Sequence, residues 1–181
     1  MEIEKTPLGG CLLIRSQPYR DPRGMFMEAF HEAALSGRLE GNPRFVQDNV
    51  SVSGKGVLRG LHFQRGEHAQ AKLVRVLQGR VRDAVGDIRP GSPTFGLHFV
   101  TELSAESGTA LYIPKGFAHG FLSLADDTVF YYKCDAYYAP GAEGGIRFDD
   151  GQLDIDWDFP AAAVRLSEKD RNLPAFKDAL V

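Results

Sequence analysis

Short runs of β-branched, aromatic and other apolar residues recur along the chain, and clusters of Gly, Pro, Asn and Asp interrupt them about every ten residues. This spacing is typical of an all-β protein, because each run is long enough for one strand and each cluster supplies a turn. Short helices are predicted only at His31–Leu39 and after Ser167. Strands are predicted at Cys11–Arg15, Met25–Phe30, Val46–Val52, Val57–Phe63, Lys72–Gln78, Val81–Ile88, Gly96–Glu102, Ala110–Ile113, Gly120–Leu124 and Val129–Asp135. Regularly spaced strands favour a jelly roll or barrel whose interior can hold a small ligand.

Three glycine-containing segments predict how strands are connected. Gly79 alone separates two strand-like runs, which predicts a tight hairpin. The proline- and glycine-rich segment Asp87–Gly96 predicts a hairpin loop. The glycines within Gly54–Gly60 lack the strand–loop–helix context of a phosphate-binding loop, so we expect them to mark another hairpin.

The composition is that of an ordinary globular protein. The chain has 43% hydrophobic and 25% charged residues, and its 181 residues fit one domain over 1–181. A formal net charge of −3 gives no overall attraction to nucleic acid or to an anionic membrane. No stretch is long and apolar enough for a membrane span or a signal peptide, so we expect a cytoplasmic location. Cys11 and Cys134 are expected to be free thiols.

One motif points to a fold family. The pattern Gly108-x5-Pro114-x-Gly116-x2-His119 reproduces the second sequence motif of the cupin superfamily, with Ser123 where an Asn is usual. Cupins are jelly rolls, which agrees with the strand pattern.

The first cupin motif is present only in part. His62 matches its first histidine, but Gln64 stands at the second histidine position, His68–Ala69 at the place of the glutamate, and Lys72 just beyond. A metal-binding cupin needs imidazoles and a carboxylate that converge on the ion. We therefore expect no metal and an interior that binds an organic anion, although a metal site of His62, His119 and an unmatched carboxylate stays an alternative.

Hydrogen-bond donors are dense around His62. Alternation places Gln64 on the same strand face as His62, so Gln64, Lys72 and Arg59 would form a cationic pocket if that face points inward. The alternative is that Arg59 and Lys72 are ordinary solvated charges.

The nine residues Gly56–Gln64 (GVLRGLHFQ) strongly resemble the dTDP-4-dehydrorhamnose 3,5-epimerase family of metal-free cupins. Further similar segments, in the family's order, are Phe45–Ser51, Gln70–Val76, Asp87–Gly96, Ile113–Phe121 and Ser167–Asp170. The similarity covers nearly the whole chain. It implies a cupin-type jelly roll that needs no cofactor and epimerises dTDP-4-dehydro-6-deoxy-glucose at C3 and C5, a step in making dTDP-L-rhamnose. Both carbons flank the C4 ketone, so removal of the proton at C3 or C5 leaves an enolate. One base, one acid and an oxyanion stabiliser are therefore sufficient for the reaction.

The resemblance implies four catalytic residues. His62 matches the base, and Asp170 matches the carboxylate that orients its imidazole. Tyr132 matches the acid that protonates the opposite face of the enolate, while the adjacent Tyr131 points to the other strand face. Lys72 matches the residue that stabilises the C4 enolate oxygen.

The resemblance also implies the substrate contacts. His119, paired with Asp83, would hydrogen-bond the sugar ring, and Tyr138 would stack on thymine. The segment Arg23–Glu28 would reach into the neighbouring subunit, so a homodimer is expected. The other residues expected to bind the nucleotide are Arg23, Phe26, Glu28, Gln47, Asn49, Arg59, Glu143 and Lys169.

Two residues depart from the family pattern. Gly86 stands where an apolar β residue is usual and Arg82 where an aromatic is common, and we expect a loosened cavity wall there.

Several functions besides 3,5-epimerisation stay open. A relative that epimerises only C3 or only C5 would differ in cavity shape near the acid. A sugar 3,4-ketoisomerase, a catalytically inactive nucleotide-sugar binding protein and a metal-dependent cupin oxygenase are also possible from the sequence. Intact His62, Tyr132 and Asp170 argue against the inactive protein, and Gln64 and Lys72 argue against the oxygenase.

Overall fold

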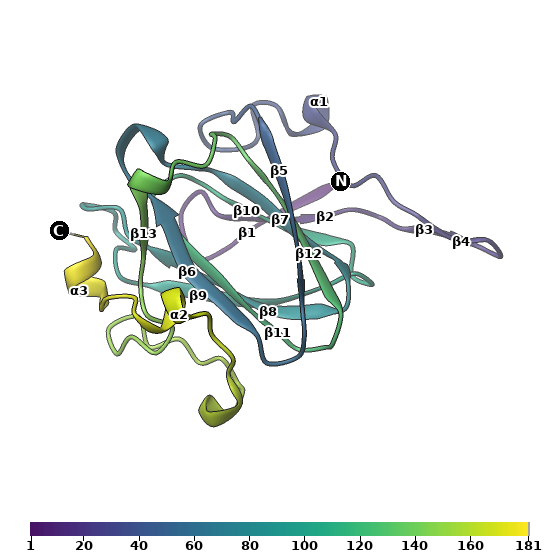
Figure 1. Ribbon diagram of the computed structural model, residues 1–181. Coiled ribbons are helices and arrows are strands. Elements are labelled where there is room, and N and C mark those ends of the chain that lie inside the picture. Colours follow the sequence, from purple (N-terminus) through teal and green to yellow (C-terminus); the bar gives the residue numbers. More distant parts are fainter. Residues whose placement is uncertain (181) are drawn as a thin grey trace.

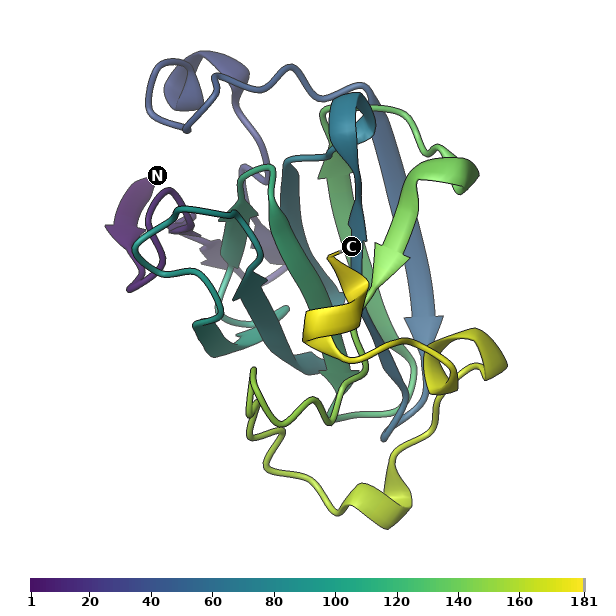
Figure 2. The ribbon, with the colours of Figure 1, turned by 90° about the vertical axis from the view of Figure 1, so that its left-hand side faces the viewer.

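The computed structural model describes residues 1–180, in which two antiparallel β-sheets pack face to face (Figures 1 and 2). The six-stranded sheet contains, in spatial order, β1 (Glu2–Lys5), β2 (Leu12–Arg15), β10 (Thr109–Ile113), β7 (Lys72–Gln78), β12 (Thr128–Cys134) and β5 (Gln47–Ser53). The five-stranded sheet contains β13 (Glu143–Gly145), β6 (Leu58–Gln64), β11 (Phe117–Ser123), β8 (Arg80–Asp87) and β9 (His98–Ser104). This arrangement confirms the predicted all-β fold class.

Smaller elements lie outside the two sheets. The strands β3 (Tyr19–Asp21) and β4 (Gly24–Phe26) form a hairpin that projects away from the sheets, which we call the arm (Figure 1). None of the helices within residues 1–180 is long and apolar enough to cross a membrane. The helical elements are α1 (Glu32–Leu35), α2 (Glu168–Arg171), α3 (Phe176–Ala179) and the 3₁₀ turns η1 (Gly66–His68), η2 (Pro140–Ala142) and η3 (Ala161–Ala163).

The predicted strands are largely confirmed, with ends that differ by a few residues. The exception is Met25–Phe30, of which only the first two residues belong to a strand, in the arm. The strands β1, β3 and β13 were not predicted because each has only three or four residues. The predicted helix His31–Leu39 shortens to α1, whereas Ser167 caps α2 as expected, its hydroxyl accepting a hydrogen bond from the backbone N–H of Asp170 at 3.0 Å.

Apolar side chains form one core between the sheets and one on each outer face. The inner core includes Val74, Leu111, Phe121 and Phe130. The outer face of the five-stranded sheet packs under the segment after β13, and the other outer face packs partly under the segment that contains α1. Period-2 alternation along each strand therefore separates inward residues from outward ones.

The hairpin predicted at Gly79 is wrong. Gly79 joins β7 to β8, which belong to different sheets, so it turns the chain from one sheet into the other. Its φ is +78°, and a Cβ there would lie 2.5 Å from the Thr128 hydroxyl, so glycine is required. The hairpin predicted at Gly54–Gly60 is wrong for the same reason, because β5 and β6 lie in opposite sheets. The hairpin loop Asp87–Gly96 is confirmed, since β8 pairs with β9.

Gly86 and Arg82 lie on the outer face of β8 and leave the cavity wall intact. A Cβ on Gly86 would lie 3.2 Å from Leu153 Cδ2, so the side chain of Leu153 fills the space that an apolar residue would occupy. Arg82 Nε donates to the backbone oxygen of Asp156 at 2.8 Å. The expected loosening of the cavity is therefore wrong.

Candidate active site

Strand β6 brings Arg59 and His62 to the same inner face, although three positions separate them. His62 lies opposite His119 and Arg59 opposite Phe121, so two residues of β6 oppose a single residue of β11 between these pairs. This is a β-bulge, and its extra residue allows side chains three positions apart to share one face, whereas regular alternation would place them on opposite faces. Gly60 permits the bulge: its φ is +125°, and a Cβ there would lie 2.5 Å from a backbone carbon of β11.

The predicted pair of His62 and Asp170 is present. The half-buried imidazole Nε2 lies 2.6 Å from Oδ1 of the buried Asp170 at the start of α2. Burial alone would raise the pKa of Asp170, but the hydrogen bond and charge of His62 hold that pKa below its ordinary value. An ionised carboxylate only accepts, so Nε2 carries the proton and Nδ1 is the basic nitrogen of the neutral ring.

A second histidine–carboxylate pair lies deeper between the sheets. His119 Nε2 lies 3.0 Å from Asp83 Oδ2, and both side chains are buried. Burial raises the pKa of Asp83, and the adjacent His119 opposes this rise. The His119 ring also stacks on Phe130, with 6.0 Å between ring centroids, so its position is fixed by both contacts.

The six-stranded sheet supplies the facing wall. In the register of β12, Tyr132 lies opposite Asn49 of β5, and Cys134 lies opposite Lys72 of β7. Tyr131 points outward as predicted and donates to Asp48 at 3.0 Å. The inward side chains line a cleft of about 350 Å³ formed by Gln47, Asn49, Phe63, Gln64, Gln70, Lys72, Tyr132, Cys134, Tyr138 and Glu143.

Burial changes the acidity of the two groups on this wall in opposite directions. It lowers the pKa of the Lys72 ammonium and raises the pKa of the Tyr132 hydroxyl. Tyr132 therefore keeps its proton at neutral pH and can donate it. When protonated, Lys72 places a positive charge beside the cleft that a developing oxyanion can use.

Glu143 joins the cleft to a second hollow. Its carboxylate accepts hydrogen bonds from the Tyr138 hydroxyl at 2.8 Å and from Lys169 Nζ at 2.5 Å. Burial alone would raise the pKa of Glu143, but these two donors hold it below the ordinary value. Lys169 lines the second hollow, of about 370 Å³, together with Arg59, His62 and Asp170.

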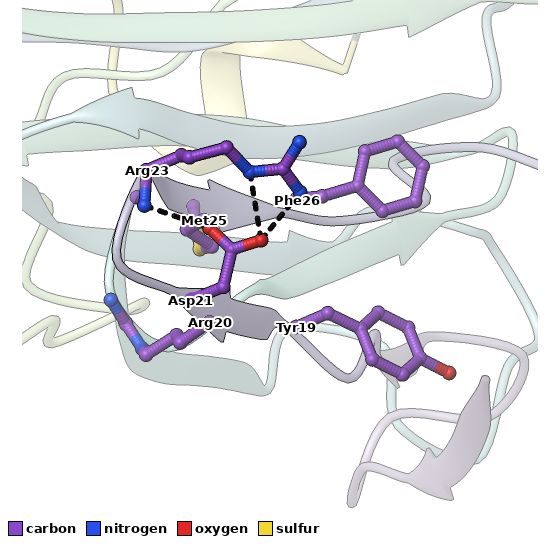
Figure 3. Close-up of a pocket in the computed structure, with 7 residues that line it drawn as sticks. Tyr19, Arg20, Asp21, Arg23, Met25 and Phe26 are labelled. Atoms are coloured by element: carbon purple, nitrogen blue, oxygen red, sulfur yellow. Dashed lines mark hydrogen bonds and ion pairs between the residues drawn. The ribbon is translucent and has the colours of Figure 1, made fainter.

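Three predicted residues lie outside this site in the same subunit. Arg23 and Phe26 belong to the arm, and Glu28 follows it; all three side chains are exposed. Figure 3 shows Arg23 turned back onto Asp21, with which it forms an ion pair. The structure therefore brings together the predicted residues of the cleft but not those of the arm.

Some residues of the cleft were not predicted. Cys134 lies two positions after Tyr132, so alternation could have identified it. Gln70 had no comparable signal. Cys11 and Cys134 are free and buried, as expected. Among residues 1–180, no group of three or more His, Cys, Asp or Glu side chains converges as ligands for one metal ion.

Comparison with known proteins identifies the family. The model of the dTDP-4-dehydrorhamnose 3,5-epimerase family matches residues 5–178. The enzyme of that name from Salmonella typhimurium is 44% identical over 181 residues, which cover 100% of this chain and 98% of the relative. The crystal structure of the Elizabethkingia anophelis enzyme is 50% identical with a TM-score of 0.94, covering 100% of this chain and 99% of that chain.

Two further structures carry ligands related to the predicted substrate. The Legionella pneumophila enzyme in complex with dTDP-4-keto-L-rhamnose is 45% identical, with a TM-score of 0.93 and coverage of 97% of this chain and 93% of that chain. A 3'-monoepimerase from Streptomyces bikiniensis in complex with dTDP-quinovose is 33% identical, with a TM-score of 0.88 and coverage of 95% and 86%. These matches confirm the cupin-type fold and the resemblance seen in the sequence. The chain belongs to the dTDP-4-dehydrorhamnose 3,5-epimerase family, the isomerases of dTDP-rhamnose biosynthesis.

Proposed function

We propose that this chain epimerises dTDP-4-dehydro-6-deoxy-glucose at C3 and C5, with His62 as base and Tyr132 as acid. One observation carries the proposal. His62 lies on the inner face of the five-stranded sheet and Tyr132 on the inner face of the six-stranded sheet, so the two side chains approach the interior from opposite walls. A sugar ring held between them loses a proton on one face and gains one on the other, which inverts the carbon.

The neighbours of these two residues support the same chemistry. Asp170 keeps Nδ1 of His62 unprotonated and stabilises the imidazolium after proton transfer. The C4 ketone turns the carbanion at C3 or C5 into an enolate, whose oxygen the Lys72 ammonium stabilises. The His119–Asp83 pair hydrogen-bonds the sugar ring. No redox step is needed, because each epimerisation only exchanges a proton.

The nucleotide binds around the mouth of the cleft. Arg59 and Lys169 provide positive charge for the diphosphate. Tyr138 is half exposed beside Gln47 and stacks on thymine. The Legionella pneumophila relative, in its complex with a dTDP-sugar, supports this class of ligand.

A second copy of this chain completes the site. Tyr19 and Phe26 of the arm are 65% and 70% exposed, and a projecting apolar hairpin is stabilised by a partner. The edge strand β5 has unpaired backbone groups along one side, and its outward residues Val50 and Val52 are 62% and 59% exposed. The arm of one subunit lies along this edge of the other.

In that position the arm brings three further residues to the site. Arg23, Phe26 and Glu28 reach the end of the cleft that contains Gln47 and Tyr138. The homodimer thereby accounts for the distance between these three residues and the cleft of their own subunit.

Two substitutions test the assignment of base and acid. His62→Ala removes the basic nitrogen, so exchange of both carbon-bound protons in heavy water falls by about 10²–10⁴-fold. Binding of dTDP stays within about threefold of the unsubstituted protein, because the nucleotide contacts remain. Tyr132→Phe keeps proton removal by His62, so exchange falls less than formation of inverted product. Equal exchange in His62→Ala and the unsubstituted protein would remove His62 as the base, and unchanged inversion in Tyr132→Phe would remove Tyr132 as the acid.

A further inference from the structure

We propose that Gln64 and Arg65, at the end of β6, are positioning residues that hold the Tyr138–Glu143 wall of the cleft. The inference rests on the proposed function, in which that wall receives the nucleotide. Gln64 stands where metal-binding cupins have a ligand, and the sequence placed it among the donors of the pocket. Its contacts give it another role.

The amide of Gln64 is fully used by backbone groups of two loops. Its Nε2 donates to the backbone oxygens of His68, at 2.8 Å, and Tyr137, at 3.3 Å. Its Oε1 accepts from the backbone N–H of Ala139 at 2.7 Å. The two residues that flank Tyr138 are therefore both bonded to one buried side chain, which fixes the backbone that carries the Tyr138 ring.

Arg65 holds the other end of the same wall. Its Nη1 donates to the backbone oxygen of Glu143 at 3.0 Å, and its Nη2 donates to the backbone oxygen of Ala179 in α3 at 2.7 Å. Its guanidinium lies 5.1 Å from the centroid of the Phe63 ring. A Cβ on Gly144 would lie 2.8 Å from Nη1, so β13 approaches Arg65 as closely as a glycine allows.

Gln64 and Arg65 hold two ends of the same segment. The segment from Tyr138 to Glu143 passes over the end of β6 between β12 and β13 (Figure 1), and its backbone N–H and C=O groups bond to β6 there. The side chains at its two ends meet in the hydrogen bond from Tyr138 to Glu143. Loss of either Gln64 or Arg65 therefore loosens both residues of the wall.

This loosening weakens binding of the base but not binding of the diphosphate. The wall faces the base, whereas the diphosphate residues do not contact Gln64 or Arg65: Arg59 bonds to Ser53 and Val52 on β5, and Lys169 meets the wall only through the Glu143 side chain. A variant of either positioning residue therefore loses affinity for dTDP while it keeps its affinity for inorganic pyrophosphate. A general structural defect would weaken the binding of both dTDP and pyrophosphate.

Two variants remove the contacts with little change in shape. Gln64→Glu keeps the acceptor for Ala139 but replaces the donor to two carbonyl oxygens by a carboxylate oxygen. Arg65→Met keeps the stem over Phe63 and loses both donors. The matched controls are Gln152→Glu and Arg147→Met, whose side chains are exposed and do not line the cleft. Should Arg65→Met fail to fold, Arg65→Lys, which keeps the charge on a single donor nitrogen, replaces it.

The test is titration calorimetry with dTDP and with inorganic pyrophosphate, together with steady-state kinetics on the dTDP-sugar. We expect Kd for dTDP and KM to rise about tenfold in both variants, with Kd for pyrophosphate and kcat within about threefold of the controls. Unchanged Kd for dTDP, or an equal loss for both ligands, would overturn the positioning role. If the unsubstituted protein itself fails to bind dTDP, the proposed function fails and this inference fails with it.

Discussion

Lys72 and Tyr132 face the same cleft from neighbouring strands, yet burial makes the lysine a stronger acid and the tyrosine a weaker one. The pKa of Lys72 is lowered, so its ammonium loses the proton at a lower pH than an ordinary lysine does. The pKa of Tyr132 is raised, so its hydroxyl stays protonated to a higher pH than an ordinary tyrosine does. Burial therefore shifts loss of the Lys72 charge to lower pH and loss of the Tyr132 proton to higher pH.

The lowered pKa of Lys72 predicts the alkaline limb of the pH profile. In the unsubstituted protein, kcat/KM falls as pH rises through the lowered pKa of Lys72, below about 10.4, the ordinary value for lysine. Lys72→Arg keeps its charge throughout, so its activity, although reduced, declines only at higher pH. The measurement is kcat/KM against pH for both proteins. An alkaline limb at the same pH in both would show that another group sets it.

Single residues of the site could be predicted to different degrees. His62, Asp170 and Lys72 were expected from the family resemblance, and the structure places Lys72 in the cleft and the other two in the adjoining hollow. The contacts of Gln64 could not be predicted, because its partners Tyr137 and Ala139 lie more than seventy positions further along the chain. Alternation placed Gln64 on the correct strand face, but only the folded loops show which groups its amide meets.

At the scale of elements, strand positions were easier to predict than strand partners. Alternating apolar residues depend on local burial, so the bounds of β7 agree with prediction. The turn at Gly79 has the sequence signals of a hairpin and of a crossing between sheets alike. The distant strands decide between the two connections: β7 pairs with β10 and β12, whereas β8 pairs with β11 and β9.

The bulge in β6 allows a prediction for the variant Gly60→Ala. Gly60→Ala places a Cβ against the backbone of β11 at a φ of +125°, so the pairing of β6 with β11 must shift. We expect a loss of about 2–3 kcal/mol in unfolding free energy, measured by urea denaturation. At a temperature where the variant is still folded, its activity also falls, because Arg59 and His62 no longer share a face. The control is Gly151→Ala, where a Cβ meets nothing within 4 Å. Equal stability of the two variants would show that the bulge tolerates a side chain.

At the scale of the whole molecule, we propose that the site of one subunit draws on the arm of the other. The arm residues were predicted from the family resemblance, but their positions in the dimer stay a prediction, as do the single domain, the cytoplasmic location and the independence from metal and cofactors. A single chain places Arg23 on an exposed hairpin, so the role proposed for it depends on a second copy.

Mixed dimers test this arrangement. Arg23→Ala removes the arm contact from the partner's site, and His62→Ala removes the base from its own site. Each variant alone is expected to be nearly inactive at substrate concentrations below KM. Dimers with one subunit of each kind regain one intact site, so an equal co-expressed mixture should recover about a quarter of the unsubstituted activity. No recovery, with mixed dimers present by mass spectrometry, would show that each site uses its own arm.

In the proposed mechanism, His62 and Tyr132 exchange protons at both C3 and C5. The most direct measurement is proton NMR of dTDP-4-dehydro-6-deoxy-glucose in heavy water with the EDTA-treated protein, followed by a coupled reductase. We predict deuterium at both carbons and dTDP-L-rhamnose as the final product. Deuterium at one carbon only would place the protein among the single-position epimerases, and no exchange until a metal is restored would contradict the mechanism.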